Sequence, residues 1–428
     1  MPNNWSSDRY GLIGSGQQTY FRTLYCAAAS VGDGSTLEAP CSLEEAKNKV
    51  RTWLQIPGND IRVWVLDSYG RFEFSDTIVF NENDCSDTIK VSWVAYPRHK
   101  PVWSGAKDFT TGWTAIGGGK YQRTVSAGTR GRHLISNGSR AIRARSGAQT
   151  GWSANFSNGV LTFTAPDATV ADLGGDLSTI ELIGHNEWKH IRVRVATVNG
   201  QTITVRNPDG ALSQSQFGYE LNGIDRFENH IGLVTQPRYW FLDTTSNVLT
   251  YYPLTSEVME ENEILFPALD TLMVCSNINQ NLSFVGLTFA DTTWTGTYSP
   301  ETIGYYCVQA GILGNANIPT SNYIPPAAVQ VVASPGIEFQ GCTFTRLGAI
   351  GLSLKSGSKG ARIIGCKFID ISAHGIMDGD VTHNSDWVGT NTSGAYCYSN
   401  LFDQCGSEFE DCCVYWGYTD GAILSHNE

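Results

Sequence analysis

The 428-residue sequence contains no apolar run close to the roughly 20 residues that a membrane-spanning helix needs. Residues 1–16 also lack the apolar core of a signal peptide. Basic residues are few, since 29 Lys and Arg stand against 41 Asp and Glu, and the formal net charge is −12. Phosphate binding needs clustered Lys and Arg, so this balance argues against nucleic acid. We expect neither a membrane span nor a nucleic-acid partner.

Motifs for bound phosphate, for a nucleophilic serine and for metal ions are also missing. The glycine-rich stretches at 14–18 and 117–120 show neither Walker spacing nor a following helix. No serine stands in a GxSxG context. The pair Cys412-Cys413 lacks metal-ligand spacing and a second pair. We therefore expect no metal and no cofactor.

The sequence does contain an internal repeat, within residues 336–380. Four pairs of positions recur 24 residues apart: Cys342/Cys366, Phe344/Phe368, Gly351/Gly375 and Leu352/Ile376. Each copy consists of short alternating apolar runs with Gly between them, which favours strands and turns over helices. Such copies stack as coils that bury their apolar ladders against their neighbours. The pattern predicts an all-β solenoid, a parallel β-helix.

The repeat extends in both directions with looser spacing. Phe289 occupies the place of Phe344, and Phe402 follows Phe368 by 34 residues. Asn427 aligns with Asn400 and Cys366, so we interpret it as a stacking residue. Near the other end, Ser42 and Glu45 resemble a capping box that begins a short amphipathic helix. That helix would cover the open N-terminal end of the solenoid.

Three regions differ in pattern. Residues 1–100 read as an N-terminal cap with the first coils, and 266–428 as the main coils, ending in a coil that looks unfinished. Between them, 101–265 contains hairpin signals at Asn137-Gly138 and Asn199-Gly200, which predict an inserted antiparallel β module. Basic residues gather there, and we favour a solvated sheet face over the wall of a cleft: Arg123, Arg130, Arg132, Arg140, Arg143 and Arg145.

Eleven cysteines bear on the compartment. Cys342 and Cys366 are expected to be buried thiols on an inward ladder. Cys26 and Cys41 are close enough in sequence to form a disulfide, as are members of the group Cys405, Cys412 and Cys413. Such disulfides would indicate an oxidising compartment. Five Asn-x-Ser/Thr sequons support secretion weakly. We expect a secreted or extracellular protein.

Several ordered blocks carry a resemblance to a known family. They are IRVWVLD, IKVSWVAYPRHKPVWSGA, RHLISNGSRAIRARS, FENHIGLVTQPRYWFLDTTSNVLTYYPL, FVGLTFADTTW and AILSHNE. Over roughly residues 35–428 the chain resembles the right-handed parallel β-helix proteins typified by glycoside hydrolase family 141, and the related β-helix family 120. The resemblance implies a right-handed β-helix around an inserted β domain. It also implies a glycosidase acting on plant-type or other complex polysaccharides.

The last 59 residues have the composition that glycoside hydrolysis needs. Residues 370–428 contain ten acidic residues and no Lys or Arg, together with Trp and Tyr. In such enzymes one carboxyl group protonates the leaving oxygen, another acts as nucleophile or base, and aromatic rings stack on sugars. Crowded carboxylates also raise one another's pKa, which helps keep one of them protonated.

Three carboxylates are the leading catalytic candidates. Asp378 occupies the ladder position that Leu354 holds one coil earlier, although a turn Asp that caps backbone groups is an equally good interpretation. Asp380 lies on the same side of that local strand and resembles a family position. Glu408, in an insertion one coil later, could face either of them, with Glu410 and Asp411 as rivals.

Four further residues are candidate substrate-binding or orienting groups: His374, Trp387, Trp416 and Asp420. A lone His at a β-helix corner is more often structural, and Asp420 is equally a plain turn residue.

Two other functions share this fold. A non-catalytic glycan-binding or structural module, such as an adhesin or fibre, would use the same coils with its acids on a solvated face. A polysaccharide lyase, the less favoured alternative, would need a Lys or Arg base. None follows Lys367, but one coil earlier the sequence has a basic group that keeps this alternative open: Lys355, Lys359, Arg362 and Lys367.

Overall fold

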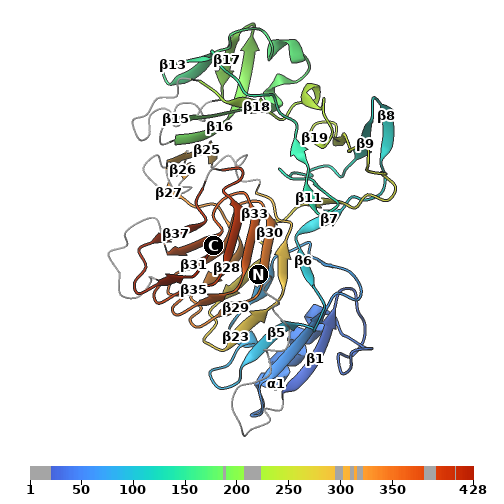
Figure 1. Ribbon diagram of the computed structural model, residues 1–428, viewed down its shortest axis with the longest axis vertical. Helices are drawn as coiled ribbons and strands as arrows, with labels where there is room; N and C mark the ends of the chain where they lie inside the picture. The colour runs from blue at the N-terminus through green and yellow to red at the C-terminus, as the bar shows by residue number, and fades with distance from the viewer. Residues whose placement is uncertain are drawn as a thin grey trace, which may run out of the picture.

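A computed structural model shows a parallel β-helix with a second β module rising from it (Figure 1). It describes residues 21–186, 189–206, 223–294, 302–308, 313–315, 322–379, 392–409 and 411–428. In this part of the chain, no helix is long and apolar enough to cross a membrane. The predicted right-handed parallel β-helix is confirmed.

Three parallel sheets form the walls of the solenoid. Sheet A contains β1 (Arg22–Ala27), β2 (Ile61–Leu66), β5 (Val91–Ala95), β23 (Leu282–Val285), β29 (Glu338–Gln340), β32 (Arg362–Ile364), β35 (Tyr396–Tyr398) and β38 (Ile423–Ser425). Sheet B contains β3 (Phe72–Glu73), β6 (Val102–Ser104), β24 (Thr288–Ala290), β30 (Thr343–Leu347), β33 (Lys367–Ile371) and β36 (Leu401–Cys405). Sheet C contains β4 (Ile78–Phe80), β22 (Met273–Ser276), β28 (Ala327–Val332), β31 (Ile350–Lys355), β34 (Ile376–Gly379) and β37 (Val414–Gly417).

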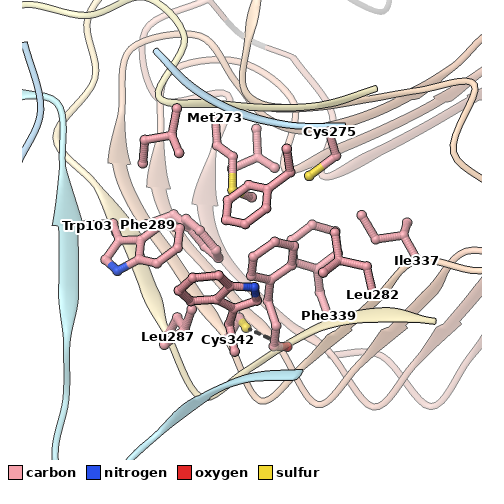
Figure 2. Packing of buried hydrophobic residues seen from close by; sticks show 14 of the residues in the cluster. Trp103, Met273, Cys275, Leu282, Leu287, Phe289, Ile337, Phe339 and Cys342 are labelled. Carbon is pink, nitrogen blue, oxygen red and sulfur yellow. Dashed lines mark hydrogen bonds between the residues drawn. The ribbon is translucent and has the colours of Figure 1, made fainter. Parts of the chain in front are cut away.

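The repeated phenylalanines stack along sheet B as the sequence predicts. Phe289, Phe344, Phe368 and Phe402 are register partners, and successive ring centroids lie 5.1, 4.6 and 5.0 Å apart. Figure 2 shows Phe289 in this interior with Trp103 and Phe339. Each ring is buried against the coil before and the coil after, so the ladder stabilises the stack only as a whole.

The repeated glycines mark a close approach of coils at the start of sheet C. A Cβ on Gly351 would lie 2.6 Å from the backbone oxygen of Gly375, and one on Gly375 would lie 2.8 Å from that of Cys413. No real Cβ tolerates such contacts, so the 24-residue spacing of these two glycines reflects the spacing of the coils.

A polar ladder accompanies the apolar one at the C-terminal coils. The Asn400 side chain accepts from the Cys366 N–H at 2.8 Å, and the Asn427 side chain accepts from the Asn400 N–H at 2.8 Å. The predicted stacking role of Asn427 is confirmed.

Helix α1 (Leu43–Leu54) lies at the N-terminal end of the solenoid, beside β1 and η2 (Glu82–Asp84) (Figure 1). Ser42 caps it by accepting the Glu45 N–H at 3.2 Å. Leu43, Ala46 and Val50 are buried in the core of the solenoid, so the predicted capping helix is confirmed.

The inserted module leaves the solenoid after β6. Its strands, antiparallel except for the parallel pair β12–β19, are β7 (Ala106–Asp108), β8 (Thr114–Gly117), β9 (Lys120–Thr124), β10 (Ile135–Ser136), β11 (Ser139–Arg140), β12 (Ile142–Arg143), β13 (Ser153–Ser157), β14 (Val160–Thr164), β15 (Glu181–Asn186), β16 (Lys189–Asn199), β17 (Thr202–Val205), β18 (Arg226–Glu228), β19 (Tyr239–Asp243), β20 (Val248–Tyr251) and β21 (Ile264–Pro267). Short 3-10 helices are η3 (Ala171–Leu173), η4 (Leu177–Thr179) and η5 (Ile231–Leu233).

The module also contains strands from a later part of the chain. Strands β25 (Thr302–Val308), β26 (Leu313–Asn315) and β27 (Asn322–Tyr323) extend its large sheet, because β25 pairs antiparallel with β16. They lie between β24 and β28 of the solenoid, in a stretch that has no clear strand pattern in the sequence.

Ten of the eleven cysteines, those whose side chains the structure describes, are free thiols. Cys342 and Cys366 are buried on the inward ladder, as predicted. Cys26 and Cys41 meet only through a parallel backbone bridge, and the group Cys405, Cys412 and Cys413 forms no disulfide. The expectation of local disulfides is therefore wrong for these residues: Cys26 and Cys41 are packed as buried thiols, whereas Cys412 and Cys413 are exposed thiols.

Candidate functional site

The turns from sheet B to sheet C carry the excursions of the chain. The chain leaves the solenoid after β6 and returns at β22, then leaves after β24 and returns at β28. In the last two complete coils, the turns at this same edge of the solenoid are shorter. They join β33 to β34 and β36 to β37. We call this edge the B–C corner. Strand β34 crosses sheet C from there and ends at Gly379, at what we call the C–A corner.

Asp378 and Glu408 lie at these two different corners. The backbone N–H of Glu408 donates to the Ser372 carbonyl at 3.2 Å, before β34 begins, whereas Asp378 lies near the end of β34. Residues 372–375 form the bend at the B–C corner, and Asp378 contacts Thr419 further along sheet C, away from the residues that bond Glu408. The structure therefore does not bring these two carboxylates together as a pair, and the catalytic role of each stays a prediction.

Asp378 replaces an apolar ladder residue, as the sequence indicates. It is the register partner of Leu354 on one side and of Trp416 on the other, and it is fully buried. Thr419 donates to one carboxylate oxygen at 3.2 Å, and the other has no hydrogen-bond partner among the described residues. Burial raises the pKa of Asp378, and the hydroxyls of Thr392 and Thr419 oppose this only in part.

Asp378→Asn is expected to raise the free energy of unfolding by about 1 kcal/mol at pH 7.5. The amide keeps the shape of the carboxylate and removes a charge that burial disfavours. Because the folded-state pKa of Asp378 is raised, the gain should shrink as the pH falls and the native carboxylate protonates. Urea unfolding at pH 7.5 and pH 4.5 measures both values.

Asp243→Asn is the matched control, and its expected change in stability has the opposite sign. Asp243 accepts the backbone N–H groups of Thr245 and Ser246 and the Ser246 hydroxyl, and although partial burial acts to raise the pKa of Asp243, these contacts lower it. Its amide variant should be less stable at pH 7.5. A loss of stability in Asp378→Asn as large as in Asp243→Asn would contradict our assignment of Asp378 as a strained buried acid.

Glu408 lies at the B–C corner, where the inserted module meets the solenoid. Arg132 Nε lies 2.7 Å from its Oε1, His133 Nε2 lies 2.8 Å from its Oε2, and the Ser372 hydroxyl lies 3.2 Å from Oε2. Burial would raise the pKa of Glu408, but Arg132 and His133 hold it well below its usual range. The side chain is 14 % exposed, so an ionised carboxylate keeps limited access to solvent.

Glu408 belongs to a larger buried ion cluster. Arg132 also bonds Glu181 at 2.9 Å, Arg143 bonds Glu181 at 2.9 Å and Glu228 at 3.1 Å, and Arg192 bonds Glu228 at 2.6 Å. Arg192 additionally donates to the Glu408 carbonyl at 2.8 Å. We call these three arginines and three glutamates the joint cluster: Arg132, Arg143, Arg192, Glu181, Glu228 and Glu408. Its formal charges balance, which is what a buried site requires.

His133 and Ser372 beside Glu408 do not form a nucleophilic triad. The same His133 nitrogen, Nε2, faces both Glu408 at 2.8 Å and the Ser372 hydroxyl at 3.3 Å, whereas a triad needs the two ring nitrogens to face different partners. Ser372 is also fully buried. Burial, with a further contribution from Arg140, lowers the pKa of His133 to about 4, so its ring is neutral at pH 7.

The remaining predicted site residues divide between the two corners. His374 is buried at the B–C corner, with Nδ1 3.2 Å from the Cys412 carbonyl oxygen, which supports the structural interpretation. Trp416 and Asp420 lie toward the C–A corner: Trp416 is half-buried beside Asp378, and Asp420 is exposed and pairs with Ser393 through an isolated parallel bridge. Asp380 and Trp387 lie outside the described residues.

Sequence reasoning missed the cationic half of the site. Three arginines that we expected on a solvated sheet face are buried, or nearly so, in ion pairs where the inserted module meets the solenoid, which we call the joint: Arg132, Arg140 and Arg143. Arg140 bonds Asp370 at 2.9 Å and the Ser372 hydroxyl at 2.8 Å. The expectation is wrong for these three because their partners are distant in sequence. The one local signal was the density of arginines in RHLISNGSRAIRAR.

In the part of the chain that the structure describes, no group of three or more His, Cys, Asp or Glu is placed to hold a metal ion. The groups that the joint cluster and its neighbour His133 present are an ionised carboxylate, fixed cations and a neutral imidazole.

Comparisons with known proteins support the fold. No family model and no curated protein sequence matches the chain. A solved structure described as "Glycoside hydrolase" matches with a TM-score of 0.78 and 19% identity, over 90% of this chain and 74% of that one. A second, "The complex structure of XylC with xylose", aligns at 10% identity and a TM-score of 0.37, over 95% of this chain and 65% of that one.

Only the first of these likenesses carries weight, and at 19% identity it is a likeness of fold. It extends over nine-tenths of the chain, so it includes the solenoid together with most of the inserted module. The chain is thus a parallel β-helix protein with an architecture shared by a structure described as a glycoside hydrolase.

Proposed function

We propose that the protein is a glycoside hydrolase acting on a complex polysaccharide, with Glu408 as the ionised carboxylate of its active site. The observation that carries the proposal is the environment of Glu408. Arg132 and His133 keep its carboxylate deprotonated, yet 14 % of the side chain stays exposed at the edge where the module meets the solenoid. The shared architecture with a structure described as "Glycoside hydrolase" supports the same reading.

An ionised carboxylate can act in glycoside hydrolysis as the nucleophile or as the base that activates water. Arg132 would orient one oxygen and His133 the other, which restricts the direction of attack. The reaction also needs a carboxylic acid to protonate the leaving oxygen. Asp380, which lies outside the described residues, and Asp378, which is fully buried among them, remain the sequence-based predictions for that acid.

Glu408→Gln is expected to lower the rate of polysaccharide hydrolysis by roughly 10³-fold or more, because the amide cannot act as nucleophile or base. Release of reducing sugar from a panel of plant polysaccharides measures the loss. Glu257→Gln is the matched control, since Glu257 is also half-buried and accepts from Ser136 and Tyr251 hydroxyls at 2.7 and 2.8 Å. The control should keep wild-type activity.

A non-catalytic glycan-binding module is the second candidate, and one observation favours it. Every Glu408 oxygen already has a protein donor, as in a purely structural ion pair. Hydrolysis that persists in Glu408→Gln would remove Glu408 from the mechanism. Glycan binding by the wild type without release of reducing sugar on any substrate would favour the binding module.

A further inference from the structure

A separate cavity of about 340 Å³ lies within the inserted module. Its wall comes from β12, β16, β19, the 3-10 helix η4 and the turn after β19. The volume is at the lower end of the range for small-molecule sites. Four arginines line it, against a single carboxylate: Arg130, Arg143, Arg194 and Arg206, against Asp176.

Two of these arginines have no carboxylate partner among the described residues. Arg130 donates to the Thr129 carbonyl at 2.9 Å, and Arg206 donates to the Ser178 carbonyl at 3.5 Å. Asp176 supplies the one negative charge of the wall, and its Oδ1 accepts the Ser178 N–H and hydroxyl at 3.0 and 2.6 Å. Among the described residues, two exposed arginines of the cavity wall thus stand against one carboxylate, and this part of the wall has a net positive charge.

The wall also contains a buried indole ring. Trp240 is 1 % exposed, and its indole N–H has no hydrogen-bond partner among the described residues. The nitrogen itself is covered by protein atoms, so Trp240 contributes its ring to the cavity wall and no donor to an occupant. The neutral groups of the wall, including Ser178, Thr179 and Asn229, suit a ligand with several hydroxyls.

We propose that this cavity binds the anionic group of an acidic sugar, either the carboxylate of a uronic acid or a sulfate ester. The anion would pair with Arg130 and Arg206, since guanidinium groups bind planar or branched oxyanions through paired N–H donors. That the ligand is a sugar rests on the proposed function, whereas its negative charge follows from the cavity alone.

The cavity is connected to the joint cluster through Arg143. This arginine lines the cavity and bonds both Glu181 and Glu228. Glu181 in turn bonds Arg132, which holds Glu408. An acidic sugar in the cavity would thus lie against the same ion network as the proposed catalytic carboxylate, as expected of a subsite that selects acidic polysaccharides.

Binding is tested with sugars that differ only at C6: galactose, galacturonate and galactose 6-sulfate, with the corresponding glucose series. Ligand-observed NMR at low ionic strength measures each affinity in the full chain. We expect at least one acidic form to bind tenfold or more tightly than its neutral parent. Arg130→Gln and Arg206→Gln should each weaken that binding about tenfold. Arg145→Gln, which removes an exposed arginine of the same module outside the cavity, should leave it unchanged.

The two acidic forms identify the source of the anion, because preference for the carboxylate indicates a uronate and preference for the sulfate a sulfate ester. Equal binding of neutral and acidic sugars, or unchanged affinity in the Arg130→Gln, Arg206→Gln double variant, would overturn the proposal. So would the absence of binding by every acidic sugar. Arg206→Lys, which keeps the charge, should retain part of the affinity and serves if a Gln variant fails to fold.

This outcome is distinguishable from failure of the proposed function. Binding of acidic sugars without hydrolysis would support the cavity and reject the glycosidase. Hydrolysis of neutral polysaccharides alone, with no binding of acidic sugars, would reject the cavity and leave the role of Glu408 standing.

Discussion

Replacing Arg132 with methionine is expected to lower the free energy of unfolding by about 3–5 kcal/mol, enough to release the joint between the inserted module and the solenoid. The Arg132 side chain is fully buried and lies within 2.9 Å of Glu181 and 2.7 Å of Glu408. Methionine fills a similar volume but leaves three glutamates against two arginines. The loss of stability arises because a buried carboxylate is left without a positively charged partner. Urea unfolding at pH 7.5 measures the free energy of unfolding.

Arg71→Met is the matched control for this prediction. Arg71 also forms ion pairs with three carboxylates, Glu73, Asp108 and Glu263, but those carboxylates are 45–50 % exposed. Water therefore solvates them after the arginine is lost, and the expected cost is at most about 1 kcal/mol. Equal losses in the two variants would contradict the view that burial of the glutamates, and not the number of ion pairs, sets the energy of the joint.

The coils of the solenoid were predictable because their signal is local. Parallel in-register pairing places Phe344 on Phe368 and Leu354 on Asp378, so a 24-residue spacing in the sequence becomes a ladder in space. The hairpin at Asn137-Gly138 was predictable for the same reason. Both residues have positive φ, 46° and 74°, which few other residues tolerate in succession.

The joint was not predictable from the sequence. Arg132 and Glu408 are 276 residues apart, and the pairing of two charged side chains imposes no periodicity on the residues between them. Strand β25 illustrates the same limit, since it leaves the solenoid to pair with β16, more than a hundred residues earlier. Asp378 was the one site residue that the sequence did mark, because it takes the place of Leu354 in the 24-residue repeat of an apolar ladder.

The joint should also make the protein sensitive to acid well above the pH at which carboxylates protonate. Burial, with help from Arg140, lowers the pKa of His133 from its ordinary 6.5 to about 4. Between these values the unfolded chain binds a proton at His133 that the folded chain does not, so stability falls as the pH falls from about 6.5 to 4. This difference corresponds to about 3 kcal/mol. Below about pH 4.5 the glutamates of the joint cluster act in the same direction, because the pKa values of Glu228 and Glu408 are lowered in the folded state by neighbouring arginines that outweigh burial.

His133→Gln should flatten the dependence of stability on pH between 6.5 and 4, measured as urea midpoints at half-unit intervals. Some slope will remain, because burial also lowers the pKa values of His190 and His230. His426→Gln, at an exposed position on the last coil, should keep the full wild-type slope. If His133→Gln loses stability on acidification as steeply as the wild type, the imidazole beside Glu408 is not the proton-sensitive group of the joint, and the acid response must come from elsewhere in the fold.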